Sequence, residues 1–283
     1  MKGIKWMLTL VAAMMALVSC GPKKEGQNEE EPKKMLVLYY SQTSNTKSVA
    51  QEIATRLDAD IEEIVPLKPF DGDFGATIAR CNEEREQGIK TEIKPIAANL
   101  DDYDIIFIGY PVWFGTFAPP VATFLDQTDL SNKTIVPFCT FGSGGLDSSV
   151  KDLTQKQPNA KILPGYGVRA ARLDAMPKEV DQFLKAGGFI EGEYTKLEDF
   201  PEAQPVTEEQ AAIFDKAVGD YPMISAKATT VASRAVPGGT EYLFTAVDKP
   251  RPGAPAGPAP AGEMKIYVLA IDGEAPVFTQ VVR

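Results

Sequence analysis

The segment Met35-Leu-Val-Leu-Tyr-Tyr40 is a short apolar run, and the segment Ser41-Gln-Thr-Ser-Asn-Thr46 after it contains only hydroxyl and amide side chains. Over residues 46–57, which begin at the end of this polar segment, apolar side chains recur every four positions, at Val49, Ile53 and Leu57. The apolar run predicts a buried strand, and the four-residue spacing predicts an amphipathic helix. The order of strand, polar loop and helix favours an α/β fold.

Strand-like and helix-like segments alternate up to about Gly188. Further strands are predicted for residues 61–65, 103–110 and 134–140, and a weaker one around residues 161–163 or Val168. Helices are predicted between them, over residues 77–86, 119–130, 145–155 and 177–186. Uniformly apolar strands are typical of strands buried on both faces. Residues 35–188 are therefore expected to form a doubly wound, five-stranded parallel sheet with helices on both faces.

The N-terminal residues have the pattern of an export signal. Lys2 and Lys5 flank the start of an apolar run over residues 6–18, which is too short to cross a bilayer comfortably. The tetrad Leu17-Val-Ser-Cys20 resembles the lipobox of bacterial lipoproteins, which implies a signal peptide over residues 1–19 and acylation of Cys20. The protein would then be anchored to membrane lipid in the bacterial cell envelope, facing the periplasm or the outside. An ordinary secretory signal with a chance cysteine is the alternative.

Composition restricts the chemistry that the chain can perform. The polar residues 20–34 predict a flexible tether, and the net charge of −10 disfavours nucleic acid and acidic membranes as partners. The sequence has no histidine, which excludes Ser-His-Asp and Cys-His nucleophiles and metal sites that contain histidine. Cys139 lies in an apolar strand, where a cysteine is more often an inert thiol than a redox group. A redox centre would therefore be a bound cofactor.

The polar segment 41–46 is suited to bind an anion. The first N–H groups of a helix are unpaired and lie at the positive end of its dipole, and hydroxyl groups add further donors. Such residues also cap helices in proteins that bind nothing there. In open α/β sheets, however, ligands bind at the carboxyl ends of the strands, so the position of the loop favours phosphate binding.

Two further loops follow predicted strands. The segment Gly109-Tyr-Pro-Val-Trp-Phe-Gly-Thr116 has three aromatic rings, which either stack on a flat ligand or pack into a core. The segment Thr140-Phe-Gly-Ser-Gly-Gly145 opens a helix, and its glycines would allow the backbone to approach a ligand closely. It does not match a dinucleotide-binding motif, because Asp147 stands where the third glycine would be.

The three loops together resemble those of the flavodoxin family, over about residues 35–188. Residues 38–46 are similar to its FMN phosphate loop, T/S-x-T-G-x-T, with Ser44 in place of the usual glycine. The resemblance implies FMN as the cofactor, with Tyr110 and Trp113 stacking on its ring and with no metal ligand or catalytic side chain. The implied FMN-binding residues are Ser41, Thr43, Ser44, Asn45, Thr46, Tyr110, Pro111, Trp113, Phe114, Gly115, Thr140, Gly142, Ser143 and Gly144.

A second domain is predicted over residues 206–283, after a linker at residues 189–205. Thr207 and Gln210 form a capping-box pattern for a helix that ends near Val218. Two hairpins are predicted around Pro237-Gly-Gly239 and Asp272-Gly273, separated by a Pro, Gly and Ala-rich loop at residues 250–262. One helix and four antiparallel strands resemble a cystatin-like α+β domain. The segment Arg234-Ala-Val-Pro-Gly238 lacks the glutamine of the cystatin QxVxG motif, so protease inhibition is not expected.

Two functions are compatible with these features. The first is FMN-dependent electron transfer, or reduction of a small acceptor such as a quinone, by a membrane-anchored protein with an unknown redox partner. The alternative is a non-redox interaction module of the envelope that has lost its cofactor, because a fold alone does not fix a function. Protein that purifies with a yellow colour would favour the first.

Overall fold

The computed structural model describes residues 33–70, 72–219, 221–222, 224–249 and 262–283, and Lys33–Arg283 form one compact unit. The expected signal peptide, the acylated Cys20, nearly all of the tether and most of the loop at residues 250–262 lie outside the described residues. Among the residues that are described, no helix is long and apolar enough to cross a membrane.

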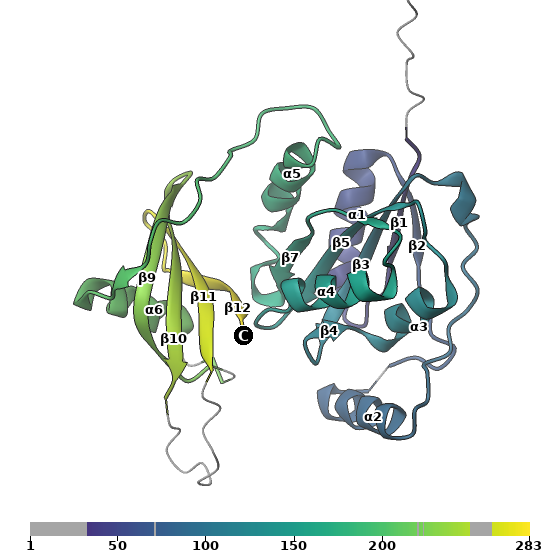
Figure 1. The fold of residues 1–283 in the computed structure, drawn as a ribbon, viewed down its shortest axis with the longest axis horizontal. Coiled ribbons are helices and arrows are strands. Elements are labelled where there is room, and N and C mark those ends of the chain that lie inside the picture. The colour runs from purple at the N-terminus through teal and green to yellow at the C-terminus, as the bar shows by residue number, and fades with distance from the viewer. Residues whose placement is uncertain (1–32, 71, 220, 223, 250–261) are drawn as a thin grey trace, which may run out of the picture. The chain divides into compact units, whose positions relative to one another are not determined.

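A parallel sheet forms the first half of the unit (Figure 1). Its strands run in the order β2-β1-β3-β5-β6, with β7 also pairing with β5, and this is the strand order of flavodoxin-like doubly wound folds. The predicted parallel sheet is confirmed, and its fifth position is shared by β6 and β7. Its strands are β1 (Met35–Tyr39), β2 (Asp60–Glu63), β3 (Ile105–Trp113), β5 (Thr134–Phe141), β6 (Lys161–Ile162) and β7 (Tyr166–Arg169).

Helices cover both faces of this sheet, as the pattern of apolar strands predicted. Alternate residues of each strand point to opposite faces, so Leu36 and Leu38 enter one core while Val37 and Tyr39 enter the other. The first core is closed mainly by α3 (Pro119–Gln127) and α4 (Leu146–Lys156), with Cys81 from α2 (Phe74–Glu86). The second is closed by α1 (Asn45–Leu57) and α5 (Met176–Ala186).

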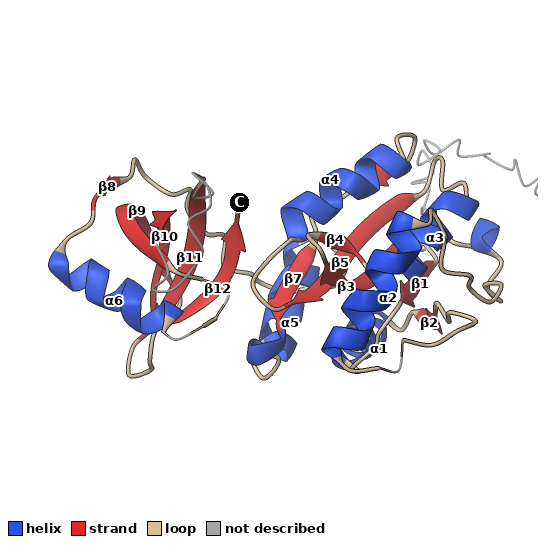
Figure 2. Cartoon of the chain, turned by 90° about the horizontal axis from the view of Figure 1, so that it is seen from below, coloured by secondary structure: helices blue, strands red, loops and turns tan. Residues whose placement is uncertain are grey.

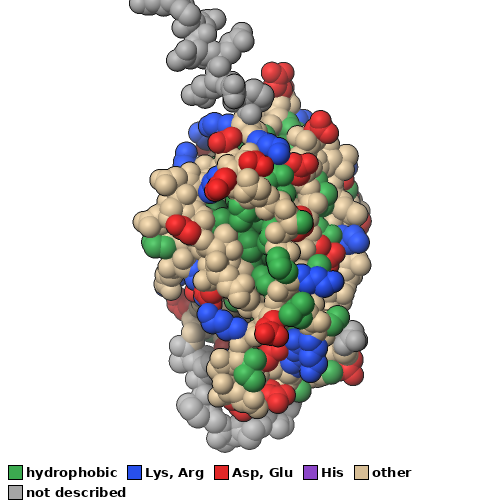
Figure 3. Space-filling view, turned by 90° about the vertical axis from the view of Figure 1, so that its right-hand side faces the viewer, with side chains coloured by type: hydrophobic (Ala, Val, Ile, Leu, Met, Phe, Trp, Pro, Cys, Tyr) green, Lys and Arg blue, Asp and Glu red, His purple; other side chains and the backbone are tan. Residues whose placement is uncertain are grey.

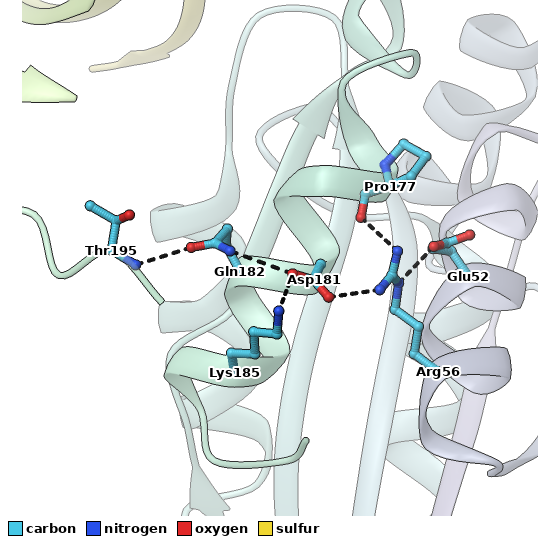
Figure 4. Close-up of polar contacts among 7 residues, drawn as sticks. All are labelled: Glu52, Arg56, Pro177, Asp181, Gln182, Lys185 and Thr195. Carbon is cyan, nitrogen blue, oxygen red and sulfur yellow. Dashed lines mark hydrogen bonds and ion pairs between the residues drawn. The ribbon is translucent and has the colours of Figure 1, made fainter. Parts of the chain in front are cut away.

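Arg56 joins the two helices of the second face. Its guanidinium donates to the carboxylates of Glu52 and Asp181 and to the carbonyl oxygen of Pro177, so one side chain on α1 holds two residues of α5 (Figure 4). Asp181 also forms an ion pair with Lys185 one turn further along α5. These groups are partly exposed, so the network orients the helices more than it stabilises them.

The fifth position of the sheet is divided between β6 and β7, whereas the sequence predicted a single weak strand at one place or the other. Pro137 lies in β5 at the level of the interruption, between Ile135, which pairs with Ile162, and Phe138, which pairs with Tyr166. Proline has no N–H group to donate to a neighbouring strand. The neighbouring chain therefore leaves the sheet after Leu163 and rejoins it at Tyr166.

An antiparallel sheet and one helix form the C-terminal part (Figure 2). The sheet order is β12-β11-β10-β9-β8, from strands β8 (Gln204–Pro205), β9 (Ala226–Val236), β10 (Gly239–Asp248), β11 (Glu263–Ile271) and β12 (Val277–Val282). The helix α6 (Glu208–Val218) begins with the predicted capping box of Thr207 and Gln210. Its Phe214 packs on Phe244 of the sheet. The similarity of this part to cystatins stays a prediction.

The segment expected to be a linker is irregular and exposed, apart from its last two residues, which pair as β8 with β9. Its exposed part includes Lys196, which lies between two anchored positions. The N–H of Thr195 donates to the side chain of Gln182 on α5, and the carbonyl oxygen of Glu198 accepts from Arg234. We predict that the segments on either side fold separately.

Limited trypsin digestion tests this separation. Within residues 33–283, the first cut is expected after Lys196, because exposed backbone without secondary structure enters a protease most readily. Both fragments should then resist further digestion, as followed by mass spectrometry. A first cut after Lys133 or Arg169, inside the parallel sheet, would contradict the boundary.

Candidate functional site

The polar loop leads from β1 into α1, as expected. Ser44 caps the helix in the left-handed region, with φ of 68°, at the position where the flavodoxin loop usually has glycine. Its carbonyl oxygen accepts hydrogen bonds from the backbone N–H and the hydroxyl of Ser48. Thr43 is exposed and Asn45 is half-buried at the first position of the helix. The loop therefore places hydroxyl groups beside the unpaired N–H groups of a helix start.

Ser41 has a hydroxyl oxygen that is buried and that finds no hydrogen-bond partner within the described part of the chain. A buried hydroxyl without a partner costs free energy, and proteins rarely tolerate one without a reason. A phosphate oxygen at the start of α1 would supply the missing partner. This orphan group is therefore a sign that the loop fits an anion.

Thr46 links the first loop to the third. Its side chain is buried, and its hydroxyl forms a 2.8 Å hydrogen bond with the hydroxyl of Thr140, which lies 94 residues away in the sequence. The structure thus brings two predicted site residues from separate loops into direct contact.

The aromatic loop is a tight turn between β3 and the short strand β4 (Thr116–Phe117). Its two central residues, Phe114 and Gly115, have φ of 51° and 82°. A bulky residue with positive φ is strained, and such strain is concentrated at functional sites. The hydroxyl of Ser148 on α4 donates to the carbonyl oxygen of Gly115 and fixes the turn. Pro111 is half-buried opposite Thr140 of β5.

Trp113 is held by other aromatic side chains. Its ring makes edge-to-face contacts with Tyr40, at 5.9 Å between centroids, and with Phe70, at 5.2 Å. Gln42, in the first loop, donates to the carbonyl oxygen of Phe70 and to the hydroxyl of Thr77. The first loop and the aromatic loop are therefore packed together through one aromatic cluster.

Tyr110 requires a correction, because the expected stacking on a ligand is wrong. Its side chain is fully buried, its ring packs edge-on against Phe117, and its hydroxyl is hydrogen-bonded to Ser149. Burial raises the pKa of this phenol. Tyr110 is thus a core residue, and Trp113 and Phe114 remain as the rings that a ligand can reach.

The glycines of the third loop also have an unexpected neighbour. A Cβ atom on Gly144 would lie 2.1 Å from the carbonyl oxygen of Val281, and one on Gly142 would lie 2.9 Å from the hydroxyl of Tyr221. We expected these glycines to allow a ligand close to the backbone. In the structure, the atoms that lie close to them belong to Tyr221 and Val281 of the C-terminal part. Ser143, between them, accepts a hydrogen bond from the backbone N–H of Val281.

These loops border a cavity of about 840 Å³, which is within the usual size of cofactor sites. Among the predicted residues it is lined by Trp113, Phe114, Gly115, Gly142, Ser143 and Gly144. Neighbouring residues that the sequence did not indicate complete it: Gln42, Phe74, Thr77, Ile78, Val112, Gly145, Asp147, Ser148, Lys151, Tyr221, Val281, Val282 and Arg283. Gln42, Val112 and Gly145 lie within the three loops that the sequence singled out, and Asp147 and Ser148 lie at the start of the predicted helix that the third loop opens. The remaining residues carry no such signal.

The apolar side of the cavity reaches the solvent. Phe74 is 82% exposed and Phe114 is 57% exposed, although both are large hydrophobic residues. Figure 3 shows hydrophobic side chains at the surface of one face, among charged side chains of both signs. Exposed rings that line a cavity are typical of a binding site for a flat ligand.

Among the described residues, neither Cys139 nor the acidic groups form a reactive thiol or a metal site. Cys139 is fully buried, and this burial raises the pKa of its thiol, so the thiol stays protonated and unreactive. Within the described ranges, no three Cys, Asp or Glu side chains come together in a way that could hold a metal ion.

The parallel sheet and its three strand-end loops define a flavodoxin-type α/β protein. The sequence profile of the flavodoxin family matches residues 34–181, which is more than half of the 283-residue chain. The protein belongs to this family, and membership supports FMN as its cofactor.

Two curated relatives and one solved structure are similar to the chain. NAD(P)H dehydrogenase (quinone) 3 of Rhizobium meliloti (strain 1021) is 34% identical over 126 residues, 41% of this chain and 58% of that protein. NAD(P)H dehydrogenase (quinone) of Gluconacetobacter diazotrophicus is 33% identical over 102 residues, 34% of this chain and 46% of that protein. The chain thus spans about half the length of these relatives. A Lactobacillus acidophilus NCFM flavoprotein in complex with FMN is 27% identical, with 48% of this chain and 93% of that chain covered and a TM-score of 0.44.

The strained conformation of Ser44 gives a testable consequence. Positive φ costs a residue with a Cβ atom about 1–2 kcal/mol, whereas glycine adopts it freely but loses about 0.5–1 kcal/mol through its more flexible unfolded state. We therefore expect Ser44→Gly to raise the free energy of unfolding by up to about 1 kcal/mol, as measured by urea titration.

The control is Ser48→Gly, which places glycine inside α1, where it should lower the free energy of unfolding by about 0.5–1 kcal/mol. Equal losses for both variants would show that the left-handed conformation at Ser44 carries no strain.

Proposed function

We propose that the protein is a membrane-anchored flavoprotein that binds FMN and reduces a small acceptor such as a quinone. The observation that carries the proposal is a cavity of about 840 Å³ that is lined by the aromatic loop, by the Gly142 loop and by Gln42 of the first loop. The first loop also has a buried hydroxyl, that of Ser41, which finds no partner within the described residues. When it is bound, FMN supplies the redox chemistry by taking up and releasing electrons.

The first loop would hold the phosphate. The N–H groups at the start of α1 point out of the helix, and the hydroxyl groups of Ser41 and Thr43 add donors to them. Charge-assisted hydrogen bonds of this kind are stronger than neutral ones. The bond between Thr46 and Thr140 would fix the loop rather than supply its main donors, because both side chains are already buried and paired.

The aromatic loop would hold the ring. Trp113 and Phe114 line the cavity on one side, and Gly142 and Ser143 line it on another, so a flat ligand would have ring surface and backbone as neighbours. Phe114 keeps much of its surface exposed, which leaves room for an acceptor to approach.

Two observations support a quinone-like acceptor: the apolar lining of the cavity and the names of the curated relatives. The exposed part of the cavity is apolar and aromatic at Phe74, Ile78 and Phe114, which suits a planar apolar molecule such as a quinone. The two curated relatives carry the name NAD(P)H dehydrogenase (quinone), although the chain spans only about half of their length. Electron transfer to a larger redox partner would need the same cofactor.

The lipobox-like tetrad that ends at Cys20 supports attachment to the cell envelope. Acyl chains on Cys20 would hold the folded part near the membrane, where apolar quinones are dissolved.

The phosphate loop is tested with two ligands that differ only in the phosphate. In the intact protein freed of flavin, Ser41→Ala combined with Thr43→Ala removes the two hydroxyls proposed as donors, each worth about 1.5–3 kcal/mol to a charged ligand. FMN affinity should fall at least about a hundredfold in calorimetric titration, while riboflavin affinity should change far less.

Trp113→Ala serves as the control for the ring, since it should weaken FMN and riboflavin alike through lost stacking. Failure of the parent protein to bind FMN at micromolar concentration would sink the proposal and favour the non-redox module. Equal losses of affinity for FMN and for riboflavin in the double variant would show that the loop does not bind the phosphate.

The anchor is tested by metabolic labelling with a fatty acid in a bacterial host. The parent protein should be labelled and should sediment with membranes, whereas Cys20→Ser should do neither, because only a thiol at that position accepts the lipid. Labelling of Cys20→Ser at the parent level would overturn the assignment.

A further inference from the structure

The free edge of the C-terminal sheet contacts the third loop of the flavin site. β12 is the edge strand of its sheet, so one row of its backbone groups has no partner strand. Two of these groups bond to the other half of the unit: the N–H of Val281 donates to the carbonyl oxygen of Ser143 at 2.7 Å, and the carbonyl oxygen of Phe278 accepts from Arg169 at 3.0 Å. The edge is therefore paired with the loop.

Arg169 fastens the same contact from the side of β7. Its guanidinium also donates to the carbonyl oxygen of Gly142 at 2.8 Å and lies 3.4 Å from the centre of the Phe278 ring. The residue is only 8% exposed, and this burial lowers the pKa of its side chain. Buried charges are kept where they are hydrogen-bonded on several sides, so Arg169 specifies one arrangement of β12 on the loop.

The side chains of β12 alternate between two surroundings. Val281 packs into the core of the C-terminal sheet, next to Phe278 and Ile266. Val282 follows it in the strand, so it points the other way, and it lines the cavity together with Tyr221. Tyr221 packs against Phe278, at 5.2 Å between ring centroids, and its hydroxyl adjoins Gly142.

We propose that Tyr221 and Val282 form a wall of the FMN cavity and position the isoalloxazine ring against the Gly142 loop. The inference rests on the proposed binding of FMN. The C-terminal sheet is then part of the flavin site. Its wall also narrows the access to the ring, which suits a small planar acceptor better than a protein partner.

Val282→Asp in the intact protein tests the wall. A carboxylate replaces the apolar contact that the valine side chain makes with the ring, so affinity for FMN and for riboflavin should fall by a similar factor, of about tenfold or more, in calorimetric titration. The equal loss distinguishes this wall from the phosphate loop, whose variants should affect FMN alone.

Val277→Asp is the matched control, because Val277 belongs to the same strand, is 37% exposed and does not line the cavity. It should bind both flavins as the parent does. If Val282→Asp binds flavin with the affinity of the parent, or if Val277→Asp loses as much affinity as Val282→Asp does, the proposed wall is contradicted. A parent protein that binds no flavin would overturn the proposed function and the wall with it.

A second variant has a readout that is independent of flavin. Gly144→Ala would put a methyl group 2.1 Å from the carbonyl oxygen of Val281, so β12 should leave the loop. Hydrogen exchange at the Val281 amide should then become faster, and the affinity for both flavins should decrease. Ser143→Ala keeps the backbone carbonyl that accepts this bond, so the exchange rate at the Val281 amide should stay at the parent value. Unchanged exchange and unchanged affinity in Gly144→Ala would refute the contact.

Discussion

The parallel register of three central strands is the constraint on which the site depends. Tyr39 of β1 is paired with Gly109 of β3, and Gly109 is paired with Phe138 of β5, so all three strands are level at their carboxyl ends. Each strand then continues into a loop at the same edge of the sheet, and these loops meet although up to 100 residues separate them in the chain. A shift of one residue would send Tyr39 and Gly109 to the wrong faces.

Most of this arrangement could be predicted from the sequence because it depends on local patterns. Buried parallel strands are uniformly apolar, and helix starts are rich in hydroxyl side chains, so the strands, the helices and the three loops that follow the strands could be located. The alternation of side chains along β3 also predicts that Tyr110 is buried in the core and does not contact the ligand. It shares a face of β3 with Ile106 and Ile108, and both of these are core residues. Stacking was predicted for Tyr110 because the loop is rich in aromatic residues, whereas the alternation along the strand decides where its side chain lies.

What the sequence could not predict is contact between distant segments. Glycines at 142 and 144 indicate that something approaches the backbone closely, but the pattern is the same whether a ligand or another strand does so. The neighbour proves to be Val281, more than 130 residues further along the chain. The split of the fifth strand opposite Pro137 is a similar case, because the missing N–H matters only once its partner strand is known.

The contacts of β12 also determine what the third loop can offer a ligand. The carbonyl oxygens of Gly142 and Ser143 already accept hydrogen bonds from Arg169 and from the N–H of Val281. With these acceptors occupied, the groups left at this end of β5 are the N–H donors at the start of α4. The isoalloxazine ring accepts hydrogen bonds at two carbonyl oxygens and at ring nitrogens, and it donates one from N3–H. In the proposed site, the N–H groups at the start of α4 would match these acceptors, and the C-terminal sheet would take up part of the acceptor capacity of the loop.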